Sequence, residues 1–225
     1  MFWSFCGVDG VGKSTTMQAV ARELLTIGTD NFILTKEPGG PLALKAEWNL
    51  AEDDVLNGYF GFPYETGPQV REFCVNHPGI PQLAKRAMFK ADSLCNWEHI
   101  IKPAIQSDEF VMSDRSWISD LVYGSVLCKL DPHALFQFNM ALTPQLHGIT
   151  KVICLTAPEK VRESRLTCTN HMDKLGSKIR NDIAKAYKNI IPDYVREGQY
   201  YFVDSDRELS IVVREIIDII SEDSE

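Results

Sequence analysis

A glycine-rich segment near the start of the chain has the composition and spacing of a phosphate-binding loop. Residues 7–14 read Gly-Val-Asp-Gly-Val-Gly-Lys-Ser, which matches the pattern G-x-x-x-x-G-K-[ST]. In such a loop the glycines let backbone N–H groups turn inward around phosphate oxygens. Lys13 would reach the β- and γ-phosphates, and the Ser14 hydroxyl would coordinate Mg²⁺. The candidate nucleotide-binding residues are Gly7, Val8, Asp9, Gly10, Val11, Gly12, Lys13, Ser14 and Thr15.

Charged and glycine-rich residues also follow later apolar runs of the chain. Residues 35–40 read Thr-Lys-Glu-Pro-Gly-Gly after one run, and Asp114-Arg115 follows another. Asp114 is placed to hold Mg²⁺ and Arg115 to bind phosphate oxygens, with a purely structural ion pair as the alternative. Arg162 and Arg165 lie on a segment that is either a mobile lid over the phosphates or a solvated helix face. These groups suit phosphoryl transfer, which depends on positioning and electrostatic stabilisation.

Five short apolar runs predict the strands that position these groups. The stretches between several of them have apolar residues at helical spacing, which is typical of a parallel sheet covered on both faces. Ligands bind such sheets at the carboxyl ends of the strands, where the motifs above lie. We expect strands at 2–6, 31–35, 110–113, 151–155 and 200–203, and helices after the phosphate loop and over 84–105, 178–191 and 208–220.

Length and composition suit one α/β domain of 225 residues. The apolar runs are too short to span a membrane, and the first strand leaves no room for a signal peptide, so we expect a cytoplasmic protein with reduced cysteines. The net charge of −8 argues against nonspecific binding of nucleic acid. Between residues 151 and 190 basic residues predominate, which indicates either a phosphate-handling segment or a solvated helix face.

Residues 47–70 interrupt the periodic pattern. The segment combines aromatic residues with glycines and prolines and shows little periodicity. It is either an insertion beside the site or a surface flap with its own aromatic cluster. The aromatic residues are Trp48, Tyr59, Phe60, Phe62 and Tyr64.

Taken in series, these motifs resemble the thymidylate kinase family. The resemblance covers most of the chain apart from the aromatic insertion. It implies one P-loop kinase domain over residues 1–225, with a five-stranded parallel sheet, helices on both faces and a lid at about 158–180. It rests on residues 7–15, 35–40 and Asp114-Arg115, supported by residues 89–92 leading into 101–105, by Arg71-Glu72, and by Pro158-Glu159 followed by Arg165.

The resemblance implies transfer of the γ-phosphate of ATP, with Mg²⁺, to a thymidine-type deoxynucleotide, which would convert dTMP to dTDP. A homodimer is a further expectation. The resemblance and the chemistry above together indicate five candidate catalytic residues: Lys13, Glu37, Asp114, Arg115 and Arg165. Arg162 and Arg165 join the loop in ATP binding, Ser14 and Asp114 are the candidate Mg²⁺ ligands, and Asp9, Lys36, Glu37, Arg71, Phe89 and Tyr123 are the candidate acceptor-binding residues.

Four positions on the acceptor side depart from the family pattern. Lys36 stands where the family has Arg, and Ser93 stands where the following helix supplies an Arg. Ser116 replaces a Tyr, and Gly124 replaces a Gln after Tyr123. Loss of bidentate arginines weakens recognition of a free monophosphate more than it weakens ATP binding. The residues on the ATP side are intact, so the sequence leaves only the acceptor open.

Three functions remain open from the sequence. The first is a dTMP kinase with an altered acceptor pocket. The second is a kinase of a hydroxyl group with Glu37 as general base, acting on a free deoxynucleoside or on 5-hydroxymethyluracil in DNA. The latter activity belongs to viral relatives, so a viral source, and with it the host cytoplasm, is an expectation, with DNA only as substrate. The third is a nucleotide-gated switch or assembly NTPase, which the acceptor-type residues disfavour.

Overall fold

The computed structural model describes residues 1–41, 66–77, 79–166 and 175–222. Its centre is a sheet with strands in the order β3-β2-β4-β1-β5-β6. Five of these strands pair in parallel, which confirms the predicted sheet, and the two-residue β3 (Gly40–Pro41) adds an antiparallel edge to β2. The parallel strands are β1 (Phe2–Cys6), β2 (Phe32–Lys36), β4 (Phe110–Asp114), β5 (Thr150–Thr156) and β6 (Tyr200–Asp204).

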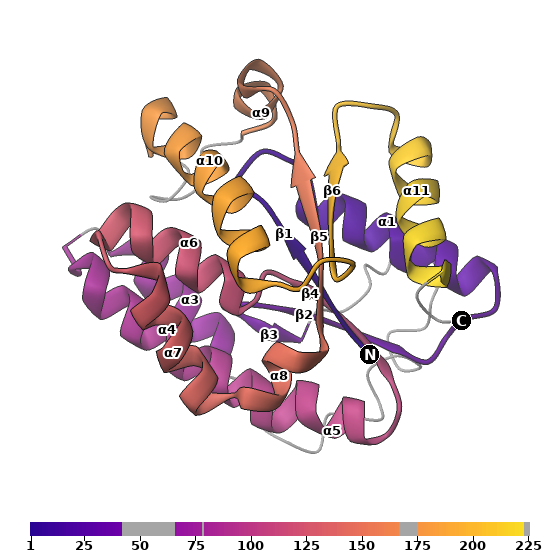
Figure 1. Cartoon of the computed structure of the whole chain (residues 1–225), viewed down its shortest axis with the longest axis horizontal. Coiled ribbons are helices and arrows are strands. Elements are labelled where there is room, and N and C mark those ends of the chain that lie inside the picture. Colours follow the sequence, from indigo (N-terminus) through magenta and orange to yellow (C-terminus); the bar gives the residue numbers. More distant parts are fainter. Residues whose placement is uncertain (42–65, 78, 167–174, 223–225) are drawn as a thin grey trace.

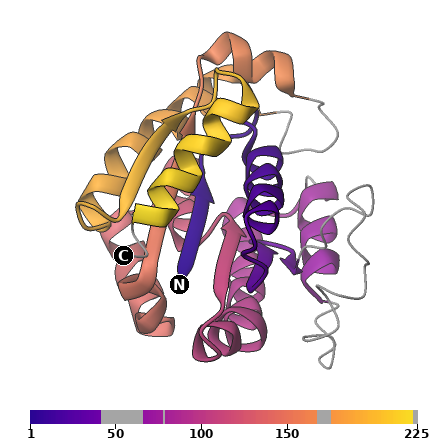
Figure 2. The ribbon, with the colours of Figure 1, turned by 90° about the vertical axis from the view of Figure 1, so that its right-hand side faces the viewer.

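Helices cover both faces of the sheet. Figure 1 shows α1 and α11 on one side and α6 and α10 on the other, and Figure 2 shows α1 beside α11. The predicted helix over 84–105 forms as α4, a π-helical turn at Trp97–Ile101 and α5. The helices are α1 (Lys13–Thr26), α3 (Thr66–Asn76), α4 (Gln82–Asn96), α5 (Lys102–Gln106), α6 (Trp117–Cys128), α7 (Pro132–Leu142), α8 (Pro144–Ile149), α9 (Glu159–Arg165), α10 (Ser177–Tyr194) and α11 (Leu209–Glu222).

The strand β1 is buried at every position because helices cover the sheet on both sides. Phe2, Trp3 and Phe5 have no exposed surface, and they explain why this short aromatic run forms a strand in the core. The face of α11 that carries Val212 and Ile216 is likewise buried. Among the described helices, none is long and apolar enough to cross a membrane.

Two predicted segments lie partly outside the described residues. The five aromatic residues of the 47–70 segment all fall in the range 42–65, outside the description, and its last residues, 66–70, begin α3. The expected lid at about 158–180 contains α9 and the start of α10, while residues 167–174 are also outside the description.

The sheet brings the sequence motifs together because its parallel strands end at one edge. The register pairs Asp114 at the end of β4 with Phe5 of β1 and with Lys36 of β2. Residues that follow β1, β2 and β4 therefore lie side by side, although they are far apart along the chain.

Candidate active site

The phosphate loop connects the end of β1 to the start of α1. Gly10 has a φ of +87°, and a Cβ at this position would lie 2.5 Å from the carbonyl oxygen of Arg162. A Cβ at Gly7 would lie 2.6 Å from the carbonyl oxygen of Leu155. Glycine is therefore required at both positions. The N-terminus of α1, which is the positive end of its dipole, follows directly and favours an anion at the loop.

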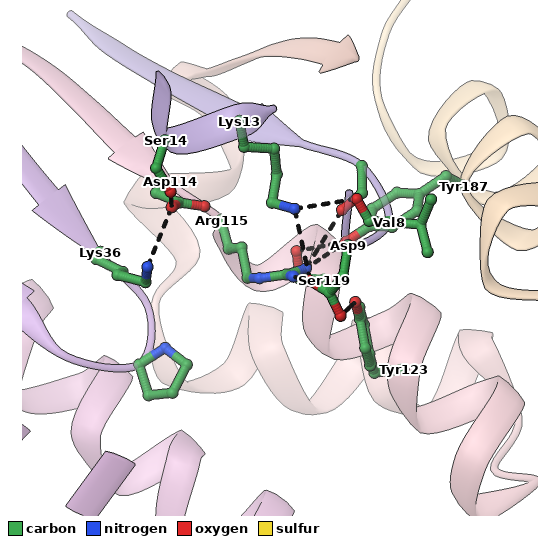
Figure 3. A network of polar contacts seen from close by, with 12 residues as sticks. Val8, Asp9, Lys13, Ser14, Lys36, Asp114, Arg115, Ser119, Tyr123 and Tyr187 are labelled. Atoms are coloured by element: carbon green, nitrogen blue, oxygen red, sulfur yellow. Dashed lines mark hydrogen bonds and ion pairs between the residues drawn. The ribbon is translucent and has the colours of Figure 1, made fainter. Parts of the chain in front are cut away.

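Asp114 lies next to the loop at the end of β4. Its Oδ2 accepts a hydrogen bond from the Ser14 hydroxyl at 2.5 Å and lies 3.3 Å from Nζ of Lys36 (Figure 3). Burial acts to raise the pKa of this carboxyl, but Lys36, Lys13 and Arg115 more than offset burial and lower the pKa of Asp114 to about 2. Asp114 is therefore a carboxylate at neutral pH.

Ser14 and Asp114 have the chemistry that a Mg²⁺ site requires. Mg²⁺ prefers oxygen ligands and is commonly held by one or two carboxylates together with phosphates and water. The Oδ1 atom of Asp114 is buried and has no hydrogen-bond partner among the described residues, so one carboxylate oxygen is left for a cation. The two predicted Mg²⁺ ligands thus lie together and fit the ion.

Arg115 is engaged with two residues of the phosphate loop: it pairs with Asp9 and donates to the carbonyl oxygen of Gly7 at 3.4 Å. Its side chain also donates to the hydroxyl of Tyr187 at 3.2 Å (Figure 3). The hydroxyl of Tyr123 donates to Asp9 at 3.3 Å, and Nζ of Lys13 lies 3.7 Å from Asp9. Burial acts to raise the pKa of Asp9, yet Arg115 and Lys13 hold it below its usual value. Asp9 is therefore a carboxylate that positions the charges around the loop.

A pocket lies over the phosphate loop, and we call it the loop pocket. Arg165, at the end of α9, borders it as predicted, and its guanidinium donates to the carbonyl oxygen of Ser205 at 3.1 Å. This contact joins α9 to the segment that follows β6. The pocket is lined by Asp9, Gly10, Val11, Gly12, Lys13, Ser14, Thr15, Thr16, Arg165, Leu166, Ser205, Arg207, Leu209 and Val212.

The structure does not bring Arg162 to the loop pocket. Its side chain is buried, Nε donates to the carbonyl oxygen of Ala157 at 3.1 Å, and a second guanidinium nitrogen donates to Asn181 of α10 at 2.5 Å. It borders a different pocket, together with Val8 and residues of β5 and α10. The reason is packing, because α10 contacts α9 and its Asn181 accepts a hydrogen bond from the Arg162 guanidinium.

A second pocket lies between α4 and α6, and we call it the helix pocket. Of the six predicted acceptor-binding residues, Asp9, Glu37, Arg71, Phe89 and Tyr123 line it. Lys36 does not line it, because its ammonium group is directed to Asp114. Asp9 lines both pockets, so the two meet at the loop.

Glu37 is a buried carboxyl group that lines the helix pocket. Its Oε2 accepts a hydrogen bond from the Ser93 hydroxyl at 3.0 Å, whereas Oε1 is buried without a partner among the described residues. Burial raises the pKa of Glu37 to about 7, although Lys90 and Ser93 act in the opposite direction. A carboxyl group with this pKa can exchange a proton near neutral pH.

Sequence reasoning missed a polar chain of residues from α4, α6 and α7 beside the helix pocket. Arg86 of α4 donates to the backbone oxygen of Asp120 at 2.7 Å and to its Oδ1 at 2.8 Å. Asn139 donates to Oδ2 of Asp120 at 2.9 Å, and Lys90 donates to Asn139 at 2.6 Å. Lys85, on the same turn of α4 as Arg86, lines the pocket, and its buried ammonium group has no partner among the described residues. The sequence feature that could have revealed this polar chain is the set of cationic residues at 85, 86 and 90 on one amphipathic helix.

Comparison with known proteins gives concordant results. No family model matches the sequence. The chain is 24% identical over 225 residues to the thymidylate kinase of Campylobacter concisus, which covers 98% of this chain and 99% of that protein. It is 25% identical over 213 residues to the thymidylate kinase of Bifidobacterium longum subsp. infantis, covering 94% of this chain and 82% of that protein.

The fold is similar to that of a solved structure with the same family name. The crystal structure of thymidylate kinase from Ehrlichia chaffeensis matches with a TM-score of 0.64 and 20% identity, over 98% of each chain. This structural likeness is evidence for the fold. The evidence for the family comes from the relatives whose sequences match nearly the whole chain. Both comparisons agree with the phosphate loop and the parallel sheet found here, and together they support the thymidylate kinase family and a kinase.

Proposed function

We propose that the protein transfers the γ-phosphate of ATP to a thymidine-type deoxynucleotide and so converts dTMP to dTDP. The observation that carries the proposal is that the loop pocket and the helix pocket meet at Asp9. A phosphate donor on the loop and an acceptor in the helix pocket would face each other beside Lys13. Relatives that match nearly the whole chain and are named thymidylate kinase support this choice of acceptor.

On the donor side, the phosphate loop and α1 bind the phosphates of ATP through backbone N–H groups and Lys13. Arg165 adds a guanidinium at the rim of the same pocket. Ser14 and Asp114 hold Mg²⁺, which neutralises charge on the transferring group when bound. Arg115 contributes buried positive charge close to the phosphate loop, and its ion pair keeps Asp9 in place.

On the acceptor side, Phe89 offers an aromatic face on which a nucleobase can stack. Asp9 of the loop and Tyr123, which donates to it, line the same pocket and are placed to meet the sugar of a bound nucleotide. Arg71, whose guanidinium donates to the carbonyl oxygen of Pro38 at 3.3 Å, lines the pocket and supplies positive charge for the acceptor phosphate.

One observation favours a second candidate, a kinase of a hydroxyl group. Glu37 combines burial, a pKa raised to about 7 and a carboxylate oxygen without a partner among the described residues, which together suit a general base. A hydroxyl acceptor, such as that of a deoxynucleoside or of 5-hydroxymethyluracil in DNA, must lose a proton on transfer. A monophosphate acceptor is already an anion at neutral pH and needs no such base.

A labelling assay separates the two candidates. The purified protein is given γ-labelled ATP and Mg²⁺ with dTMP, thymidine, or DNA that contains 5-hydroxymethyluracil. We expect label on dTMP, and Glu37→Gln should then change turnover little. Label on thymidine or on DNA but not on dTMP, with a large loss of turnover in Glu37→Gln, would replace the first candidate by the second.

A further inference from the structure

A third pocket lies beside α10, and we call it the rear pocket. It is lined by the ends of β5 and β6, by α9, by α10 and by Gly7, Val8 and Val11 of the phosphate loop. The loop pocket is bordered instead by α1 and α11, which cover the opposite face of the sheet from α10 (Figure 1). The rear pocket has a volume of about 690 Å³, equal to that of the loop pocket. It is therefore a separate space that is large enough for a small organic molecule.

The rear pocket is lined by a buried guanidinium group whose hydrogen bonds are incomplete. Arg162 is only 4% exposed, and two of its nitrogens donate to the carbonyl oxygen of Ala157 and to Asn181. The third nitrogen, Nη1, is buried and has no partner among the described residues. A buried N–H without an acceptor costs free energy, which an anion in the pocket would recover.

One face of α10 adds further positive charge to the rear pocket. Asn181, Ala184, Lys185 and Lys188 all line it, and their spacing of three and four residues places them on the same side of the helix. Both lysines are exposed, and neither makes an ion pair or a hydrogen bond within the described part of the chain. They belong to the basic stretch between residues 151 and 190, for which the sequence left open a role in handling phosphate.

Two carboxylates reduce this positive charge but do not cancel it. Glu159 accepts a hydrogen bond from the Ser177 hydroxyl at 2.7 Å, and Asp204 accepts one from the backbone N–H of Asp206 at 3.0 Å. Both carboxylates line the rear pocket, where they face three cations. One of these cations is buried, and its attraction to an anion is screened least by water and salt.

We propose that the rear pocket binds a small phosphorylated organic molecule, with its phosphate group on Arg162, Lys185 and Lys188. One guanidinium and two ammonium groups suit a phosphate dianion better than a singly charged carboxylate. Val8 and Leu155 contribute apolar surface for the rest of the molecule, and inorganic phosphate alone would fill only part of the volume. The site is distinct from the donor and acceptor sites of the proposed transfer.

Calorimetric titration with phenyl phosphate and with inorganic phosphate tests the proposal. The loop pocket is first filled with a non-hydrolysable ATP analogue and Mg²⁺, so that the added phosphate does not bind to the phosphate loop. We expect phenyl phosphate to bind more tightly than inorganic phosphate, because its ring meets the apolar wall. Benzoate, which has a carboxylate on the same ring, should bind about fivefold or more weakly than phenyl phosphate.

Variants of the three cations locate the binding site. The double variant Lys185→Gln/Lys188→Gln should weaken binding of phenyl phosphate about fivefold or more, with Tm unchanged because both side chains are exposed. Arg162→Lys should weaken it about tenfold or more, because a point charge replaces the planar guanidinium. The matched control is Lys178→Gln, which removes a charge from the same helix outside the pocket.

Three results would overturn the proposal. The first is that neither phosphate binds to the protein whose loop pocket is filled. The second is that benzoate binds as tightly as phenyl phosphate. The third is that Lys178→Gln weakens binding as much as the double variant does, which would reduce the effect to general surface charge.

Two features of the design keep the result interpretable. If Arg162→Lys fails to fold, the variants of the exposed lysines decide the outcome. Because binding is measured directly, failure of the protein to phosphorylate dTMP would contradict the proposed function and leave this test unaffected.

Discussion

The buried carboxyl group of Glu37 should make the stability of the protein depend on pH in a defined direction. Burial raises its pKa from an ordinary value of 4.5 to about 7. Between these two pH values the folded protein binds more protons at this site than the unfolded chain does. The free energy of unfolding therefore falls as pH rises. The contribution of Glu37 is fully present below pH 4.5 and is lost as pH passes through about 7.

The size of the effect follows from the two pKa values. For a single group that titrates at 4.5 when unfolded and at about 7 when folded, stability falls by about 2.5 kcal/mol between pH 5 and pH 8. Glu37→Gln keeps an acceptor for the Ser93 hydroxyl and removes the titration. The difference in free energy of unfolding between the wild type and this variant should therefore change by about 2.5 kcal/mol over that range.

Urea unfolding at pH 5, 6, 7 and 8 measures this difference directly, with the midpoint and slope recorded at each pH. Glu23→Gln on the exposed side of α1 controls for the loss of one carboxyl group from the surface. A difference between wild type and Glu37→Gln that stays constant within about 0.5 kcal/mol from pH 5 to pH 8 would refute the reasoning. In that case Glu37 would be solvated or paired in solution.

Three further predictions concern the loop. Lys13→Ala should abolish transfer to every acceptor because it removes positive charge at the donor phosphates, and substantial remaining activity in a labelling assay would contradict the placement of ATP on the loop. Gly10→Ala should lower the free energy of unfolding by about 2 kcal/mol more than Gly28→Ala in urea titrations. Both glycines have a φ near +90°, but only at Gly10 would a Cβ meet the carbonyl oxygen of Arg162, so equal losses would rule out the clash. Asp114→Asn should raise the Mg²⁺ concentration that gives half-maximal transfer about tenfold or more, and an unchanged Mg²⁺ titration would remove Asp114 from the metal site.

Those parts of the site that depend on local sequence could be predicted. The phosphate loop needs a strand, three glycines and a helix in immediate succession, and all of them are visible in one stretch of sequence. The strand ends at Lys36 and Asp114 were also predictable, because apolar runs followed by charged residues mark the edge of a parallel sheet. Lys36 was predicted to bind the acceptor, and what the sequence did not indicate is that the register of β2 and β4 places its ammonium group 3.3 Å from Asp114.

The parts that depend on contacts between helices could not be predicted. Arg86 and Asp120 are 34 positions apart and meet only because α4 packs on α6 and Gly124 leaves room between them. Arg162 was assigned to the phosphates because it lies with Arg165 on the expected lid, but the packing of α10 on α9 buries it against Asn181. Neither contact leaves a periodic signal in the chain, so only the three-dimensional packing reveals them.

The order of the strands has a consequence for how this enzyme can diverge. The loop pocket is built from the loop after β1 and from the segments after β5 and β6, whereas the helix pocket draws mainly on the segments after β2 and β4. All four positions that depart from the family pattern, namely Lys36, Ser93, Ser116 and Gly124, lie at the end of β2 or in the segments that follow β2 and β4. The variable positions thus fall on the segments that build the helix pocket, and none falls on the segments that build the loop pocket. Descendants of such a protein can exchange one substrate for another without rebuilding the machinery that handles the nucleoside triphosphate.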